Sequence, residues 1–172
     1  RDERHESHSH QCRAHDVTVP AAREIVVLKI GGSVGAEVDP AVAAIDALSD
    51  AGRPVVVVHG GGPLIGEWSS RLGLETRFVR GLRVTDEPTR DVALAVLVGL
   101  ANTTLVAALI ARGVAAVGLS GIDGAKLRAE REDDELGLVG RVTLVDSSLL
   151  EELLAGAVEP DEQFFGLLDV GH

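Results

Sequence analysis

Methionine and tyrosine are absent from this 172-residue chain, and cysteine and tryptophan occur once each. Aromatic residues make up only 2% of the sequence, so a folded core must be built from Val, Leu, Ile and Ala. The single Cys12 excludes an internal disulfide and is typical of a reducing compartment. The lack of methionine even at position 1 leaves two interpretations open, a removed initiator or a piece of a longer product.

Basic charge is also scarce. Sixteen Lys and Arg face 27 Asp and Glu, and the net charge of −11 argues against nucleic acid and anionic membranes as partners. No apolar run is expected to reach the roughly 18 to 20 residues that span a bilayer. The acid-containing N-terminus does not resemble a signal peptide. These features predict a cytoplasmic protein, and the length and 45% hydrophobic content favour one domain with a real core.

Residues 1–24 are expected to form a disordered polar tail. The stretch "RDERHESHSHQCRAHD" has no apolar period, so it cannot bury enough surface to offset the entropy of ordering it. Its histidines and Cys12 are metal-ligand types, but their spacing matches no closed zinc pattern. We therefore predict a solvated tail, and adventitious metal binding stays open as the alternative.

Strand and helix signals alternate from residue 25 to about 156. Short apolar runs at 25–30, 54–58 and 115–120 predict strands buried on both faces. Helices are expected at 39–52, 63–72, 87–112 and 146–155, and a hairpin at 126–131 and 138–145. This alternation predicts an α/β fold, a three-layer αβα sandwich with a mainly parallel sheet.

Two glycine clusters, "LKIGGS" and "VVVVHGGGP", follow two of these strands, at the sheet edge where ligands bind in such folds. Gly60, Gly61 and Gly62 lead into a helix, so free backbone N–H groups and the positive helix end favour an anion. Glycine also lacks the Cβ that would block its approach. The alternative that these glycines only form tight turns stays open.

Lys29 interrupts an apolar strand two residues before Gly31. A charge there is costly unless it reaches the sheet edge or has a partner. At the strand end, its ammonium group can lie beside the amides of Gly31 and Gly32, which is the combination that phosphoryl transfer needs. The alternative is a lysine with a buried stem and an exposed head.

Five stretches carry a family resemblance. In order, "VVLKIGGS", "VVVVHGGGP", "RGLRVTD", "AAVGLSGIDG" and "DELGLVGRV" resemble the amino-acid kinase superfamily and, more narrowly, the acetylglutamate kinases. The resemblance covers residues 25–156, which would form the N-terminal, substrate-binding domain of such a kinase. It implies transfer of the γ-phosphoryl group of ATP, with Mg²⁺, to the side-chain carboxylate of N-acetyl-L-glutamate in arginine biosynthesis.

The resemblance also implies roles for individual residues. Lys29, Gly31 and Gly32 would stabilise the transferring phosphoryl group, and Gly60, Gly61 and Gly62 would cradle the substrate. Arg83 would hold the α-carboxylate of the substrate as a bidentate partner, for which guanidinium geometry is suited. The hairpin near 126–145 would form part of a lid, and the protein would be a homodimer or a higher homo-oligomer.

The chain departs from the family pattern in three places. Ile122 and Thr103 stand where the family usually has lysine, and residues 157–172 are expected to be a divergent tail with neither an apolar strand nor a nucleotide-binding half. Truncation, an altered reading frame and divergence stay open as causes. We therefore expect weak or no activity from this chain alone.

Other functions stay open. One is a non-catalytic acetylglutamate-binding or regulatory remnant, and another is an aminoadipate-type kinase. A third is an oligomerisation module built on the helix at 87–112, whose apolar faces exceed one stripe.

Overall fold

A computed structural model of the chain describes residues 24–31, 38–156 and 164–169. The predicted polar tail at 1–24 therefore lies outside the described residues, apart from Glu24, which forms an ion pair with Arg53 at 3.1 Å. The candidate residue Gly32 also lies outside them.

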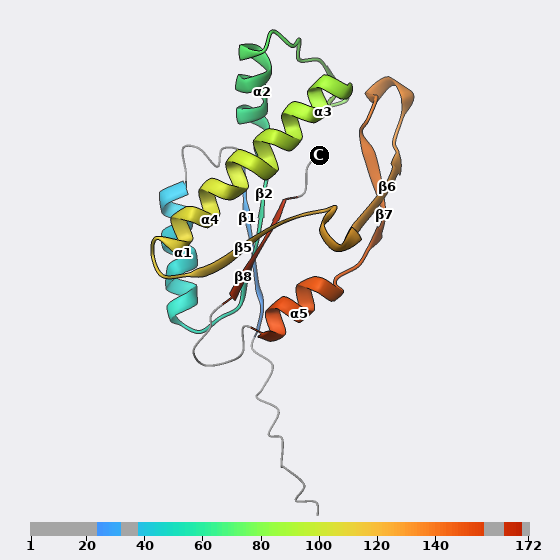
Figure 1. Cartoon of the computed structure of the whole chain (residues 1–172). Helices are drawn as coiled ribbons and strands as arrows, with labels where there is room; N and C mark the ends of the chain where they lie inside the picture. The colour runs from blue at the N-terminus through green and yellow to red at the C-terminus, as the bar shows by residue number, and fades with distance from the viewer. Residues whose placement is uncertain (1–23, 32–37, 157–163, 170–172) are drawn as a thin grey trace, which may run out of the picture.

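A four-stranded parallel sheet forms the centre of the molecule (Figure 1). Its strands, in order across the sheet, are β1 (Val26–Ile30), β2 (Val55–His59), β8 (Phe164–Asp169) and β5 (Ala115–Ser120). The ladder aligns Ile30 with His59, and Asp169 with both His59 and Ser120. The carboxyl ends of all four strands therefore meet at one edge.

Helices cover both faces of this sheet (Figure 1). On one face lie α1 (Val38–Asp50) and a long helix, and on the other lies α5 (Ser148–Gly156). The long helix joins α3 (Glu87–Leu94), a π-helical segment η1 (Ala95–Asn102) and α4 (Thr103–Ile110). The α/β prediction of a mainly parallel sheet between two helical layers is confirmed.

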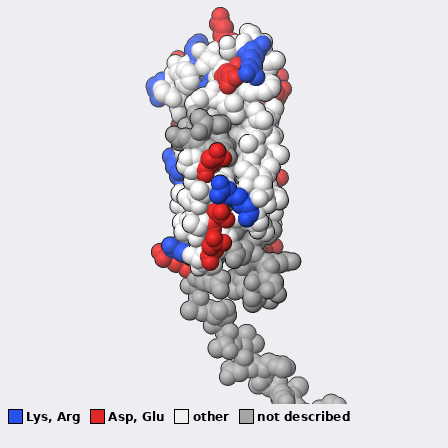
Figure 2. Space-filling view, turned by 90° about the vertical axis from the view of Figure 1, so that its left-hand side faces the viewer, with Lys and Arg blue, Asp and Glu red and all other residues white. Residues whose placement is uncertain are grey.

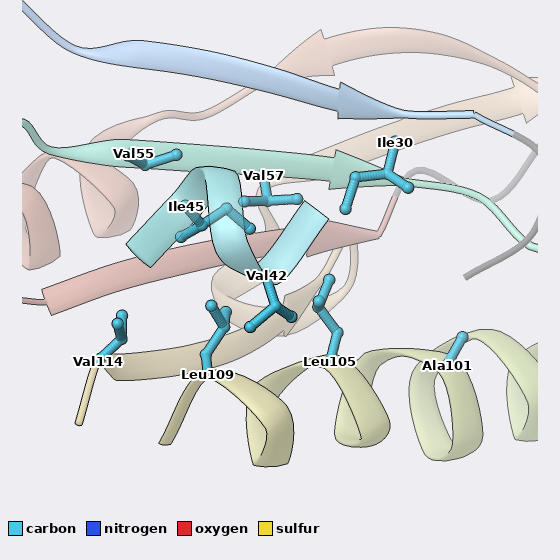
Figure 3. Close-up of a cluster of buried hydrophobic side chains, with 9 residues drawn as sticks. All are labelled: Ile30, Val42, Ile45, Val55, Val57, Ala101, Leu105, Leu109 and Val114. Atoms are coloured by element: carbon cyan, nitrogen blue, oxygen red, sulfur yellow. The ribbon is translucent and has the colours of Figure 1, made fainter. Parts of the chain in front are cut away.

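The main core lies between β1, β2, α1 and the long helix (Figure 3). It contains aliphatic side chains only, as the scarcity of aromatic residues requires. Each Val, Leu or Ile side chain contributes about 1.5 to 3 kcal/mol when it is fully buried. The members are Ile30, Val42, Ile45, Val55, Val57, Ala101, Leu105, Leu109 and Val114.

Local signals set the helix ends. The Asp86 carboxylate accepts the backbone N–H of Thr89 at 2.9 Å and so caps α3, while Gly52 and Gly113 end α1 and the long helix with φ of 66° and 83°. α1 begins at Val38, one residue before the expected Asp39.

Two antiparallel hairpins extend from the sheet. β6 (Leu127–Arg131) pairs with β7 (Gly140–Val145), as predicted, and two short strands, β3 (Phe78–Val79) and β4 (Leu82–Arg83), form the other hairpin. Short 3₁₀ turns at Asp123–Ala125 and Asp134–Leu136 flank β6.

Three strand expectations need correction. β1 is an edge strand rather than a strand buried on both faces, because Val27 is 67% exposed and Lys29 is exposed. Only the last two residues of β5, Leu119 and Ser120, are buried. The interpretation of residues 157–172 as lying outside the sheet is wrong for 164–169, because β8 pairs with both β2 and β5. The run "FFGLLD" is short and interrupted by Gly166, so its partners reveal the strand more clearly than its composition does.

The prediction that no apolar run is long enough to span a bilayer is wrong by length and composition alone. The helix Glu87–Ile110 has 24 residues, and its most apolar window has a mean hydropathy of 2.2. Asn102 and two threonines interrupt the apolar run, but the mean hydropathy of the window stays high. A third of that window, 33%, is buried inside the molecule, including the core residues Leu105 and Leu109. Packing on the sheet therefore accounts for the apolar character of its inner side.

Gly118 allows the long helix to approach β5 closely. A Cβ at this position would lie 2.5 Å from Asn102 Oδ1, and Asn102 is only 4% exposed. We expect Gly118→Ala to lower the free energy of unfolding by about 1 to 3 kcal/mol, because the buried amide must move. Urea denaturation followed by circular dichroism measures this change.

Gly99→Ala is the matched control, because a Cβ there meets nothing within 4 Å. We expect it to be neutral or stabilising, since alanine favours helix over glycine. Equal effects of the two substitutions would contradict the close-approach explanation.

Candidate active site

The carboxyl ends of β1 and β2 and the β3–β4 hairpin enclose a cavity of about 810 Å³. The remaining wall comes from α2 (Gly62–Arg71), from Leu97 of the long helix and from Val139 next to β7. All the described members of the predicted site line this one cavity: Lys29, Gly31, Gly60, Gly61, Gly62 and Arg83. Residues up to 54 positions apart in the sequence therefore converge on one space, as their positions at the ends of parallel strands led us to expect.

The glycine loop after β2 begins α2. Gly61 is the N-cap and offers no side-chain hydrogen bond, and Pro63 lies in the first turn. The first backbone N–H groups of a helix have no partner within it, so they are available to an anion at this end. A Cβ at Gly60 or Gly62 would meet nothing within 4 Å, which leaves the approach from the cavity open.

Gly61 is required for a different reason. A Cβ there would lie 2.7 Å from Leu97 Cδ2, and Leu97 is buried in a cluster with Ile65, Val92 and Val96. Close packing of the long helix therefore requires glycine at this position, and Gly61 also lines the cavity. At Gly60 and Gly62 no such contact restricts the side chain, and the predicted role of all three glycines in ligand binding stays a prediction.

Arg83 is held in place by three contacts. Its Nη1 donates to Thr76 Oγ1 at 3.1 Å, and its Nη2 donates to the Gly62 carbonyl at 3.2 Å. Its guanidinium carbon lies 4.9 Å from the centroid of the Phe78 ring. Burial lowers the pKa of Arg83, but a guanidinium group remains a cation in proteins. Two of its five N–H groups are used by the protein, and three remain for a ligand.

Lys29 lies on the exposed side of β1, in register with Val58 of β2. It lines the cavity beside Gly31 and has no ion pair or hydrogen bond within the part of the chain that the structure describes. Because Lys29 is exposed at the sheet edge, its charge avoids the desolvation penalty that a buried strand would impose. A cation without a partner at a cavity wall can neutralise an incoming anion.

Two further buried polar residues, His59 and Lys126, were not among the predicted site residues. His59 is only 1% exposed and lines the cavity; its Nε2 has no hydrogen-bond partner among the described residues. Lys126 is 3% exposed, and its Nζ donates to the Asp123 carbonyl at 2.9 Å without reaching the cavity lining. Only the position of His59, directly before the glycines, was available as a signal.

Asp123 organises the turn after β5. Its carboxylate accepts the backbone N–H of Ser120 at 2.6 Å and the Ser120 hydroxyl at 2.8 Å. These hydrogen bonds hold the pKa of Asp123 below its usual value. Local hydrogen bonding therefore explains Asp123 as a turn-forming residue.

The two hairpins are joined beside the cavity. The Thr85 backbone donates to the Leu136 carbonyl at 3.0 Å and accepts from the Leu138 N–H at 2.7 Å, and Arg80 forms an ion pair with Asp133. The backbone N–H of Glu135 and then Arg80 lower the pKa of Asp133. Since Val139 lines the cavity, the predicted contribution of the 126–145 hairpin to its cover fits this arrangement.

The two departures at lysine positions lie away from the cavity. Ile122 is 74% exposed, and Thr103 is exposed on the long helix. Neither lines the cavity, so these substitutions leave its described walls unchanged.

Comparison with known proteins agrees with this arrangement. The family model described as "Amino acid kinase family" matches residues 24–160. An acetylglutamate kinase of Dehalococcoides mccartyi is 46% identical over 139 residues, which are 81% of this chain and 51% of that protein. An acetylglutamate kinase of Methanopyrus kandleri is 45% identical over 144 residues, 78% of this chain and 54% of that protein.

Solved structures share the fold. The crystal structure of smu.665 from Streptococcus mutans covers 86% of this chain and 59% of its own, with a TM-score of 0.71 and 28% identity. An N-acetylglutamate synthase from Neisseria gonorrhoeae, at 21% identity and a TM-score of 0.64, covers 86% of this chain and 34% of its own.

The fold and the site together define a class of protein. It is an α/β sandwich in which a glycine loop suited to an anion and two cations lie at one edge of the sheet. The chain belongs to the amino acid kinase family. It spans about half the length of the curated acetylglutamate kinases that it matches.

Proposed function

We propose that this chain forms the acceptor-binding side of an acetylglutamate kinase, which transfers the γ-phosphoryl group of ATP to the side-chain carboxylate of N-acetyl-L-glutamate in arginine biosynthesis. The observation that carries the proposal is the convergence of Arg83, Lys29 and the glycine loop on one cavity. The identity to acetylglutamate kinases over about four-fifths of the chain supports it. A cytoplasmic location belongs to the same proposal.

The acceptor carries two carboxylates, and the cavity has two separate cations for them. Arg83 pairs with the α-carboxylate through its free N–H groups, because a guanidinium group matches a carboxylate in a bidentate arrangement. Lys29, the Gly31 amide and the loop at Gly60 and Gly62 receive the reacting carboxylate and the incoming phosphoryl group. Phosphoryl transfer depends mainly on such positioning and charge neutralisation.

ATP and Mg²⁺ fit the described residues to different degrees. Lys29 and the backbone amides suit the γ-phosphoryl end of ATP. The described lining of the cavity contains no Asp or Glu, and no group of three metal-ligand side chains occurs within the described ranges. This part of the chain therefore offers no fitting Mg²⁺ site, and we assign no step to the metal.

We predict that Arg83→Ala weakens binding of N-acetyl-L-glutamate by roughly tenfold to several hundredfold. The reason is that charge-assisted hydrogen bonds contribute about 1.5 to 3 kcal/mol each. Isothermal titration calorimetry on the purified 172-residue chain measures the dissociation constant, and circular dichroism checks the fold.

Arg71→Ala is the matched control, because Arg71 also stacks on an aromatic ring, Trp68, but lies outside the cavity lining. An Arg83 variant that binds as tightly as the parent would remove the role assigned to this residue. N-acetyl-L-2-aminoadipate, one methylene longer, should bind more weakly than N-acetyl-L-glutamate; the reverse order would favour the aminoadipate-type alternative.

We also predict that the 172-residue chain, assayed alone, turns over little or no ATP. The described cavity supplies cations for the acceptor. An enzyme that lacks a well-placed group for stabilising the charge of the transition state is slower by about 10² to 10³ for each such group. Trapping the acyl phosphate with hydroxylamine in the presence of ATP, Mg²⁺ and N-acetyl-L-glutamate measures turnover. A rate typical of kinases would contradict this prediction, whereas binding without turnover would agree with it and leave the non-catalytic binding alternative open.

Self-association is proposed through the outer side of the long helix. Leu94, Leu100 and Ile110 are 46%, 40% and 57% exposed. Figure 2, seen from the left-hand side of Figure 1, shows acidic and basic groups in a line with uncharged surface beside them. Burial of such side chains against a second copy is favourable.

We expect Leu100→Glu to shift sedimentation toward a smaller species, because a charge would be buried in the contact between copies. Leu72→Glu is the control, because Leu72 is 60% exposed and lies outside this helix, and it should cause no shift. A chain that sediments as a monomer before substitution would contradict the proposal.

A further inference from the structure

Phe78 is an aromatic side chain in an unusual position. The whole chain has only three Phe and one Trp, and this Phe is 57% exposed rather than buried in the core. It lines the cavity, and its ring centroid lies 4.9 Å from the Arg83 guanidinium carbon. Core packing therefore does not explain why an aromatic residue stands here.

The short hairpin places the ring and the cation together. Phe78 of β3 and Arg83 of β4 are directly paired in the antiparallel ladder, so their side chains share one face of the hairpin. The Arg83 side chain extends from there to the α2 N-terminus, where Nη2 donates to the Gly62 carbonyl. Nη1 donates to Thr76 Oγ1. The two hydrogen bonds hold the Nη atoms of the guanidinium group, and its central carbon lies over the Phe78 ring.

A guanidinium group recognises a carboxylate well only if its fork is held in one orientation. Hydrogen bonds to Thr76 and Gly62 alone leave the plane free to tilt about the line that joins them. An aromatic face removes this freedom and attracts the cation through the electrostatic quadrupole of the ring. A neighbouring aliphatic side chain would fill the space without that electrostatic attraction.

We propose that Phe78 is a positioning residue that stacks on Arg83 and orients its free N–H groups toward the α-carboxylate of the acceptor. This inference rests on the proposed function. Phe78 acts through Arg83, so its contribution exists only for ligands that carry the carboxylate that Arg83 binds.

The test compares two ligands and three variants of the 172-residue chain. The ligands are N-acetyl-L-glutamate and 4-acetamidobutyrate, which is the same molecule without the α-carboxylate. The variants are Phe78→Leu, Phe78→Trp and Trp68→Leu, and titration calorimetry gives the ratio of the two dissociation constants for each. Trp68→Leu is the matched control, because it removes the Arg71–Trp68 stack at 5.3 Å outside the cavity lining.

We expect Phe78→Leu to weaken binding of N-acetyl-L-glutamate by roughly 3- to 20-fold, as a lost cation–π contact predicts, with little change for 4-acetamidobutyrate. The affinity ratio therefore falls. Phe78→Trp, which keeps an aromatic face, should retain at least the parental ratio, and Trp68→Leu should leave it unchanged.

Two results would overturn the inference while the proposed function stands. In one, the parent binds N-acetyl-L-glutamate and Phe78→Leu keeps its affinity ratio, either with no loss of affinity or with an equal loss for both ligands, which indicates a general structural role. In the other, Phe78→Leu lowers the ratio and Phe78→Trp fails to restore it, so the aromatic face is not what matters. A parent chain that binds neither ligand would overturn the proposed function and, with it, this inference.

Discussion

Parallel pairing of the four central strands is the constraint on which the rest of the structure depends. Because the strands run in the same direction, their carboxyl ends must share one edge, and the ladder between Ile30 and His59 aligns the ends of β1 and β2. The two glycine loops therefore leave the sheet next to each other. α2 starts directly after the second loop, so its free N–H groups face the space beside Lys29. The anion-suited cavity follows from strand direction before any single side chain is considered.

The second constraint is the close contact of the long helix with this sheet edge. Leu97 meets the position of Gly61, and Asn102, five residues later, meets Gly118. The π-helical segment spans both residues, and hydrogen bonding between positions five apart keeps them on the same side of the helix. Two glycines thus allow the close approach of the helix, and one of them, Gly61, also lines the cavity. The same contact brings Leu97 into the cavity wall, so core packing and the shape of the site are linked.

The sequence was sufficient for elements with strong local signals. The valine run of β2, the capped long helix and the hairpin around "EDDELG" have patterns that depend on few distant contacts. β8 was missed because a six-residue run with an internal glycine becomes a strand only through its two neighbours. Most of the candidate site could be predicted, since glycines and charges at strand ends have few alternative explanations. The position of Phe78 in the site could not be predicted, because the pairing of two-residue strands leaves no periodic signal. The difference between Gly60 and Gly61 could not be predicted either, because it depends on the position of Leu97.

The acidity of the chain does not oppose an anionic ligand. The net charge of −11 is distributed over the molecule, and at physiological ionic strength charges separated by more than about 8 Å are largely screened at the surface. Within the cavity, the described lining contains Lys29 and Arg83 and no carboxylate. Cations at contact distance from a ligand in a partly apolar space act through a lower dielectric constant than distant surface acids do. The local arrangement therefore determines the sign of the ligand charge, while the surrounding acids disfavour nucleic acids and other extended polyanions, which would contact the whole surface.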